Sequence, residues 1–391
     1  GLRLAQAEKS LGRTSIKVNK SLDDGKSMVI VGMRGVGKTT LGQYAAEVLG
    51  FKFIDVDQYF EETLKTTVFE FINTWGWDQF RIKETAALKE LLAKDSQYGR
   101  GYVIACGGGI IETAESRDVL KEHTKTGGKV LHLVRDLDQV VRYLNRDKTR
   151  PMYGEDMMNV WRRRRSWYKE VCNFEFVAYA NSLVDDGYVS PTEWLAIKKD
   201  LQRFLHFISG RDTNHVDTTA GRVGVPTTFV SLTAKDLSLS LETLKEMCEG
   251  ADAVELRVDL LQKPEEKEEM TDIEYYGEQL AILRRTVSIP VIFTVRSKGQ
   301  AGAFSDDDEA GMFELLHWGQ RWGCEYVDVE MCWTPATIEK LIDNKGHSLI
   351  ISSWHDVQNV TPWDGKAIQV KYETGDKYSD IIKLVGVAQT F

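Results

Sequence analysis

Several features that place proteins in membranes, outside the cell or on nucleic acids are missing from this sequence. No stretch reaches the about 18 consecutive apolar residues of a membrane-spanning helix, and the N-terminus has no apolar signal core. The net charge of -9 gives no excess of basic side chains that would coat a nucleic acid. These absences predict a cytoplasmic protein with neither a membrane nor a nucleic acid as its partner.

Cysteine is scarce and dispersed. The 391 residues include five cysteines and no C-x-x-C pair, so the sequence offers no cysteine metal cage and predicts a reducing compartment. The chain is 42% hydrophobic and 28% charged, as folded globular proteins are. Its length favours two or three domains.

The pattern of apolar runs divides the chain into two domains. Residues 1–26 are polar and predict a linker or the tail of a preceding domain. In residues 27–208, strand-like runs at 51–56, 101–105 and 129–134 alternate with helical ones. This alternation is typical of an α/β fold with a parallel sheet and helices on both faces. Residues 209–225, rich in Gly, Thr and Asp, predict an interdomain linker.

A second alternation fills residues 226–391. Helical stretches at 240–248, 273–285 and 311–323 separate its strands. The succession predicts a (β/α)8 barrel, but such a barrel usually takes about 250 residues, so we expect an incomplete barrel that lacks its C-terminal strands. The expected strands are residues 228–233, 252–259, 290–296, 325–330, 348–353 and 380–385.

A phosphate-binding loop follows the first strand. Gly32-Met-Arg-Gly-Val-Gly-Lys-Thr39 fits G-x-x-x-x-G-K-[ST] between a β-branched run and a helical segment. The glycines let backbone amides surround a phosphate, Lys38 would reach its β- and γ-groups, and Thr39 would ligate magnesium. The motif therefore predicts ATP and Mg²⁺ as ligands. The expected ATP-binding residues are Gly32, Gly35, Gly37, Lys38, Thr39 and Thr40.

Two carboxylates at the end of the second expected strand indicate an acceptor site. Asp55 and Asp57 are two residues apart, so on a strand both would point to the same side, at the edge where α/β sheets bind ligands. One can hold the magnesium shell, and the other can orient and deprotonate an acceptor hydroxyl. The alternative is a solvated strand end without a ligand.

Further motifs come in a characteristic order: Phe80-Arg81 with Glu84, then Cys106-Gly-Gly-Gly109, then Arg150-Pro151, then four arginines before Trp167-Tyr168. With these, residues 28–177 resemble the shikimate kinase family, in the form found in fungal AROM pentafunctional polypeptides. A guanidinium binds a carboxylate such as that of shikimate with two parallel hydrogen bonds.

The resemblance implies a role for each matching residue. Asp57 would be the base and Asp55 the magnesium-side carboxylate, and Arg150 would close as a lid over ATP. Arg163 and Arg165 are alternatives to the matching Arg164 as a carboxylate ligand. The implied shikimate-binding residues are Asp57, Arg81, Gly107, Gly108, Gly109 and Arg164.

In the second domain, chemistry-bearing residues fall on successive expected strands. Lys383 lies within an apolar run, where desolvation would favour the neutral, nucleophilic amine. His355 follows the strand at 348–353, at the end where barrel active sites lie. Glu255 and Arg257 alternate on one strand, and Arg296 ends another. The alternatives are a structural histidine, a lysine that extends to solvent and a buried ion pair.

These residues resemble type I 3-dehydroquinases, through Glu255-Leu-Arg-Val-Asp259, Phe293-Thr-Val-Arg296, Ser353-Trp-His-Asp356 and Lys383. The resemblance implies that Lys383 forms an imine with 3-dehydroquinate and that His355 moves the proton. Glu255, Arg257 and Arg296 would bind the substrate. Gln300 stands where many bacterial members have Glu. Without the last strands, which carry a carboxylate-binding arginine, we expect little or no dehydratase turnover.

The two resemblances together predict an ATP:shikimate phosphotransferase joined to a Schiff-base dehydratase. They imply further shikimate-pathway domains in the parent chain, through which it could form a homodimer. A fungal quinate repressor, a regulator that resembles the same two domains, is the alternative. A nucleoside-monophosphate kinase is a weaker one, because a nucleobase pocket would need apolar and amide groups.

Overall fold

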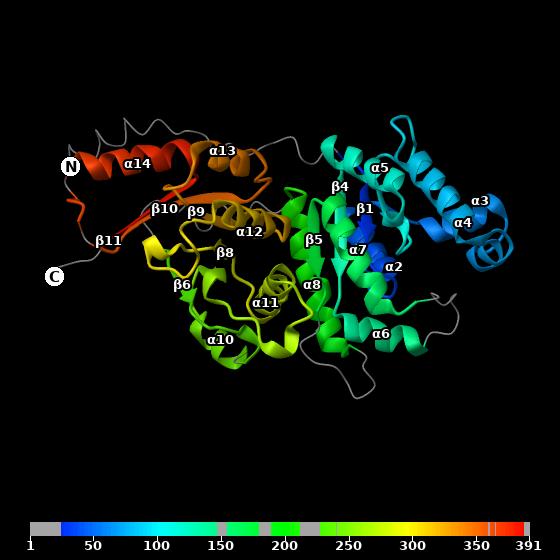
Figure 1. Cartoon of the computed structure of the whole chain (residues 1–391), viewed down its shortest axis with the longest axis horizontal. Helices are drawn as coiled ribbons and strands as arrows, with labels where there is room; N and C mark the ends of the chain where they lie inside the picture. Colours follow the sequence, from blue (N-terminus) through cyan, green and yellow to red (C-terminus); the bar gives the residue numbers. More distant parts are fainter. Residues whose placement is uncertain are drawn as a thin grey trace.

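The computed structural model describes residues 25–146, 155–179, 189–211, 227–239, 241–358, 360–363 and 365–386. They form two lobes, each with its own parallel sheet (Figure 1, blue to green and green to red). Arg150 and most of both expected linkers, 1–26 and 209–225, lie outside the described residues. Within the described part, every helix is too short or too polar to cross a membrane.

The first lobe is a five-stranded parallel sheet in the order β2-β3-β1-β4-β5. All four residues of β1 are buried, as expected of a parallel strand covered on both faces. The predicted α/β class is therefore confirmed. The strands are β1 Met28–Val31, β2 Lys52–Asp55, β3 Tyr102–Ala105, β4 Lys129–Val134 and β5 Phe174–Val177; the helices are α2 Lys38–Leu49, α3 Val56–Leu64, α4 Val68–Leu92, α5 Ala114–Lys125, α6 Leu137–Arg146, α7 Met157–Val171 and α8 Pro191–Ile208.

The second lobe is a six-stranded parallel sheet whose strands follow one another in chain order, β6 to β11. This is the expected arrangement of an incomplete (β/α)8 barrel. Its strands are β6 Phe229–Leu232, β7 Ala253–Arg257, β8 Val291–Thr294, β9 Tyr326–Glu330, β10 Leu349–Asp356 and β11 Ile381–Gly386; its helices are α10 Leu241–Met247, α11 Asp272–Thr286, α12 Glu309–Arg321, α13 Pro335–Asp343 and α14 Lys366–Tyr378.

Short 3-10 turns complete the described secondary structure. They are η1 Ile110–Glu112, η2 Leu237–Leu239, η3 Val258–Leu260, η4 Glu265–Lys267 and η5 Lys298–Gln300. Three of them, η1, η3 and η5, adjoin the expected sites.

Two strand boundaries differ from the sequence prediction. Asp57 does not lie on a strand, because β2 ends at Asp55, whose side chain accepts the Asp57 N–H and begins α3. His355 does not follow a strand, because β10 continues to Asp356 and pairs His355 with Val385 of β11. Both corrections change the direction in which a candidate side chain leaves the backbone.

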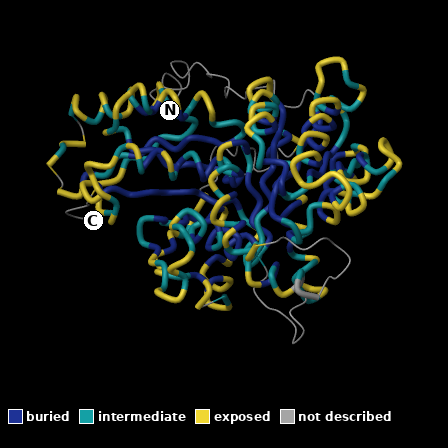
Figure 2. The backbone as a smooth tube through the Cα atoms, turned by 45° about the vertical axis from the view of Figure 1, so that its right-hand side comes forward, coloured by how far each residue is buried: buried dark blue, intermediate teal, exposed yellow. Residues whose placement is uncertain are grey.

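The lobes share a buried interface, where β5 and α8 of the first meet α11 and α12 of the second (Figure 1). Val177 of β5 belongs to the hydrophobic core of the second lobe. Arg203 of α8 donates to Glu325 at 3.0 Å, and Arg285 of α11 donates to the Val177 carbonyl. Buried residues lie on both sides of this interface (Figure 2, dark blue). The two sheets are therefore held together by packing as well as by the chain.

Candidate active sites

The glycine-rich loop joins β1 to the first turn of α2. Lys38 folds back over the loop and donates to the carbonyl oxygens of Gly32 and Met33, each at 2.9 Å. Gly37 precedes α2 with a φ of 97°, a left-handed conformation that favours glycine. It brings no side-chain oxygen to the first-turn amides. These amides, at the positive end of the helix dipole, suit a phosphate.

A hydroxyl and a carboxylate pair beside this loop. Thr39 Oγ1 donates to Asp55 Oδ2 at 2.8 Å, while Asp55 Oδ1 accepts the Asp57 N–H at 3.0 Å. Oxygen ligands of this kind suit Mg²⁺. Because Asp55 caps α3, Asp57 lies on the first turn of that helix, at its positive end.

The glycine triplet after β3 touches the expected acceptor residues and the phosphate loop. A Cβ on Gly107 would clash with Glu84 and lie 3.1 Å from Asp57 Oδ1. A Cβ on Gly108 would lie 2.9 Å from the Arg34 amide nitrogen of the loop, and one on Gly109 would overlap the Arg81 guanidinium. Only glycine fits this close approach. The fold thus brings Asp57, Arg81 and the turn together at the phosphate loop.

Arg164 is the arginine of the run that reaches this turn. It is 1% exposed, and its Nη1 donates to the Gly108 carbonyl at 3.0 Å, beside the Tyr168 hydroxyl, which donates to the same oxygen. The Arg163 side chain is 40% exposed and pairs with Glu112 and Glu155. Arg162 and Arg165 pair instead with glutamates of the second lobe.

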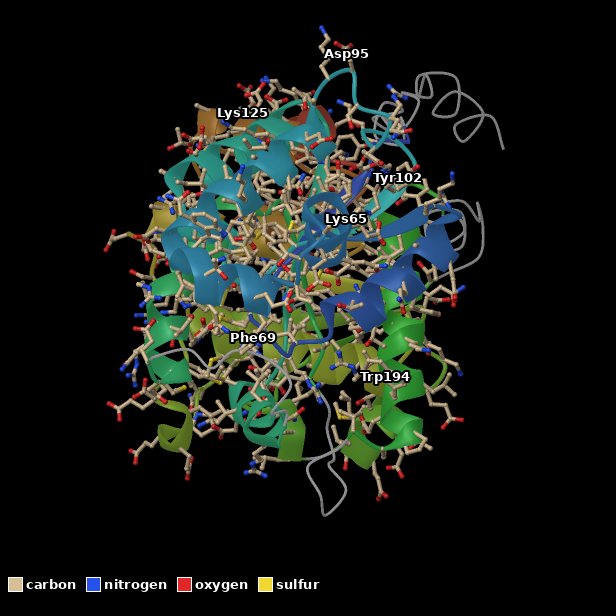
Figure 3. All side chains as sticks on the ribbon, turned by 90° about the vertical axis from the view of Figure 1, so that its right-hand side faces the viewer. Lys65, Phe69, Asp95, Tyr102, Lys125 and Trp194 are labelled. Atoms are coloured by element: carbon tan, nitrogen blue, oxygen red, sulfur yellow. The ribbon has the colours of Figure 1, made fainter. Side chains whose placement is uncertain are left out.

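Arg81 extends from α4, beside α3 in the outermost part of the lobe. Figure 3 shows these two helices facing the viewer, with Lys65 and Phe69 labelled near their junction. The guanidinium lies 5.2 Å from the Trp77 ring centroid and 5.4 Å from that of Phe80, and its Nη1 is 2.5 Å from Glu84 Oε2. Stacking on aromatic rings fixes the plane of the guanidinium.

Glu84 is a site residue for which sequence reasoning gave no role. It is buried, and burial raises its pKa although Arg81, Arg164 and Lys38 oppose the change. Its Oε1 has no hydrogen-bond partner among the described residues and adjoins Gly107. The three-residue spacing from Arg81, which places both on one helix face, is the signal that would have found it.

In the second lobe, Lys383 of β11 lies between two carboxylates. Its Nζ donates to Glu255 Oε1 of β7 at 3.0 Å and to Asp328 Oδ2 of β9 at 3.1 Å. The Phe229 ring centroid is 5.3 Å away. The expected apolar surroundings of Lys383 are therefore wrong, because strand register brings acidic side chains to the same interior face.

Arg296 joins the same group of charges. It is buried, with Nη2 2.9 Å from Asp328 Oδ2 and Nη1 3.1 Å from Glu330 Oε1 and 2.8 Å from Ser353 Oγ. Burial alone would raise the pKa of Asp328, but Arg296 and Lys383 outweigh it and hold the pKa below its ordinary value. The carboxylate is therefore ionised at neutral pH.

His355 and Gln300 form a pair at the end of β10. Gln300 Oε1 accepts the His355 backbone N–H at 3.0 Å and lies 3.1 Å from His355 Nδ1. An amide oxygen only accepts, so Nδ1 carries the proton and Nε2 is the basic nitrogen. Burial, with Arg296 and Lys383, lowers the pKa of His355 to about 4.

Arg257 is held apart from these contacts. Its guanidinium makes two hydrogen bonds to Asp259, at 2.9 and 2.8 Å, and Asp259 Oδ1 also accepts the Arg296 backbone N–H. The structure therefore brings Glu255, Arg296 and Lys383 together around Asp328, whereas Arg257, two residues after Glu255 on β7, pairs with Asp259.

Asp328, Glu330 and Ser353 had no role in the sequence analysis. The alternation in Tyr326-Val-Asp-Val-Glu330 places both acidic side chains on one face of β9, and Arg296 contacts both. The reasoning used for Glu255 and Arg257 would have identified this pair.

Comparisons with known proteins identify both lobes. Residues 34–207 match the family model of shikimate kinase, and residues 228–391 match that of type I 3-dehydroquinase. The chain thus joins a domain of the shikimate kinase family to a domain of the type I 3-dehydroquinase family, and both resemblances seen in the sequence are confirmed.

Among curated proteins, the chain is similar to pentafunctional AROM polypeptides 1 and 2 of Lodderomyces elongisporus. It is 40% identical to each over 368 residues, which are 94% of this chain and 22% of the relative. The chain therefore spans about a fifth of the length of these relatives.

Two solved structures also match. Dehydroquinate dehydratase and shikimate dehydrogenase from S. pombe AroM is 36% identical, with a TM-score of 0.40, over 42% of this chain and 31% of that one. Shikimate kinase from Acinetobacter baumannii in complex with shikimate is 26% identical, with a TM-score of 0.39, over 50% of this chain and 98% of that one.

Proposed function

We propose that the first domain transfers the γ-phosphoryl group of ATP to shikimate. The observation that carries this proposal is the contact of the Gly107–Gly109 turn with Asp57, Arg81 and the phosphate loop. Lys38 and the loop amides hold the phosphates, and Asp57 accepts the proton of the attacking hydroxyl. Arg81 and Arg164 bind the acceptor carboxylate, and Arg150 closes over ATP.

Thr39 and Asp55 are the residues that would hold Mg²⁺, which neutralises phosphate charge when bound. Their hydroxyl–carboxylate pair at 2.8 Å provides the oxygen donors that this ion prefers.

An acceptor panel tests the kinase proposal. With ATP and Mg²⁺, ADP release should depend on shikimate and should disappear in Asp57→Ala. Equal release with AMP or without an acceptor would exclude shikimate as the substrate. Binding of shikimate without any turnover would instead favour a metabolite-sensing regulator.

We further propose that the second domain carries Schiff-base dehydration of 3-dehydroquinate. Lys383 attacks the ketone, and water leaves as the imine forms. Glu255 and Asp328 hold the amine, and Glu255 accepts the proton that it loses and passes it to the carbinolamine hydroxyl, which leaves as the water. His355 Nε2 removes the C2 proton and returns one to the departing hydroxyl, and water then hydrolyses the imine. Arg296 and Arg257 would bind the substrate's polar groups.

Borohydride trapping tests this second proposal, because it reduces an imine to a stable amine. Treatment with 3-dehydroquinate and borohydride should add mass to the peptide that contains Lys383. Label on any other lysine, or equal label in Lys383→Met, would contradict the assignment.

The remaining assignments follow the relatives. We propose domain boundaries at 27–208 and 226–391, a cytoplasmic location, and no membrane or nucleic-acid partner. We propose that the parent protein carries further shikimate-pathway domains and forms a homodimer through them. Mass measurement of the parent protein in solution tests the dimer.

A further inference from the structure

A line of buried contacts runs from the second domain to the acceptor turn of the first. It begins at Trp322, at the end of α12, whose ring packs 5.9 Å from Phe293 of β8 and 5.4 Å from Trp318. The Trp322 indole Nε1 crosses the interface and donates to Glu175 Oε1 of β5 at 2.9 Å. Both partners are buried, so the bond is shielded from water.

Glu175 also contacts the neighbouring strand, β4, through its second carboxylate oxygen. Glu175 and His132 are direct partners in the β4–β5 register, and His132 Nδ1 lies 2.8 Å from Glu175 Oε2. A carboxylate only accepts, so Nδ1 carries the proton. The two oxygens of one buried carboxylate are thus engaged by a donor from each domain.

The imidazole then fixes an aromatic ring beside the acceptor turn. His132 stacks on Tyr168 with ring centroids 4.8 Å apart and planes 14° apart. The Tyr168 hydroxyl donates to the Gly108 carbonyl, the oxygen that Arg164 also engages. A shift of the Tyr168 ring would therefore move the hydroxyl that holds the Gly108 carbonyl of the glycine turn.

We infer that Trp322 of the second domain is a positioning residue for the acceptor site of the first, acting through Glu175, His132 and Tyr168. The inference rests on the proposed kinase function for its substrate, shikimate. It predicts that acceptor binding depends on the docked second domain. The affinity for ATP should stay the same, because the bond from Tyr168 to the phosphate loop goes to the Met33 sulfur, a weak acceptor at 3.8 Å, and not to a phosphate-binding amide.

The test uses Trp322→Phe in the full chain, which removes the indole N–H and keeps a ring in the interface. The KM for shikimate should rise about two- to tenfold, the range that one buried hydrogen bond covers, with the KM for ATP unchanged. Trp318→Phe, a neighbouring buried tryptophan on the same helix, is the matched control and should leave both constants unchanged. Equal effects of the two variants would overturn the inference.

A double-mutant cycle with Tyr168→Phe separates positioning from loss of packing. If the contacts act in series, Trp322→Phe should add little to the change in KM already caused by Tyr168→Phe. Full additivity would contradict a shared route. Glu175→Gln, which breaks the line at its middle without changing side-chain size, should reproduce the rise in KM even where Trp322→Phe folds poorly.

A second readout needs no substrate, so it separates this inference from the kinase proposal. Amide hydrogen exchange of residues 106–112 should be faster in Trp322→Phe than in wild type or Trp318→Phe. The bonds from the Ile110 amide to the Gly107 carbonyl and from the Glu112 amide to the Gly109 carbonyl close this turn and report the change. Unchanged exchange would overturn the inference. An absence of shikimate turnover in the wild type would overturn only the kinase proposal.

Discussion

The two candidate sites are built from different parts of their sheets. In the first domain, Lys38, Asp57, Arg81 and Arg164 extend from helices and meet at glycine-rich loops. In the second, Glu255, Asp328, Ser353 and Lys383 lie within strands, and register sets their contacts. A site made of loops and helix ends can move around a substrate, whereas a site made of strands is preorganised and depends on balanced buried charge.

This difference predicts that stability is most sensitive in the strand-built site. Arg296→Met would leave Asp328 and Glu330 without their guanidinium and should destabilise the second domain by about 3–5 kcal/mol. Amide exchange of β9 and β10 under increasing urea measures the loss. Arg163→Met, which removes half-exposed ion pairs with Glu112 and Glu155 in the first domain, should cost no more than about 1 kcal/mol. Equal losses would remove the distinction between the sites.

The loop-built site should lose activity without losing stability. Lys38→Ala should reduce shikimate-dependent ADP release by about 10²–10³-fold, since a cation aimed at the transferring phosphate is removed. The melting temperature should stay the same, because the Lys38 hydrogen bonds go to its own loop. Lys89→Ala, which removes an exposed pair with Glu115, is the control. A large fall in melting temperature with Lys38→Ala would contradict this picture.

A smaller effect is expected from pH in the second domain. The His355 pKa of about 4 lies below its ordinary value, so the folded state binds fewer protons than the unfolded state between about pH 4 and 6.5. Stability from this residue is therefore present above that window and is lost as pH falls through it. His355→Gln should flatten the melting temperature across this range. An unchanged slope would show that other groups set it.

Gln300→Glu should shift the same titration. A carboxylate within hydrogen-bond distance of Nδ1 favours the protonated imidazole, so the pKa of His355 should rise by about one unit or more. Borohydride trapping measures imine formation at Lys383 as a function of pH. The acid limb of this profile should move to higher pH together with the pKa of His355. An unmoved limb would mean that His355 is not the group that titrates.

Much of the first site could be predicted because its motifs are local. The phosphate loop, the glycine triplet and the arginine run are contiguous in the sequence, and the fold brings them together. The sequence analysis placed Asp57 on a strand and His355 after a strand, and both placements were wrong. The cap that Asp55 forms begins α3 before Asp57, and the pairing of β10 with β11 continues through His355. Asp328 was missed because its partners, Arg296 and Lys383, come from distant parts of the chain. Glu84 was missed because its raised pKa depends on burial, which the sequence does not show. Trp322 could not be found, because its role arises from the contact between domains.

The central claim is that the buried guanidinium of Arg164, and not an exposed neighbour, binds the acceptor carboxylate at the Gly108 turn. The direct measurement is the KM for shikimate in Arg164→Lys and in Arg163→Lys, with the KM for ATP measured in parallel. We predict a rise of about tenfold or more for Arg164→Lys, because a lysine ammonium cannot keep the bonds to Glu112 and the Gly108 carbonyl and also bind the acceptor, and almost none for Arg163→Lys. Equal changes, or a change confined to ATP, would contradict the claim.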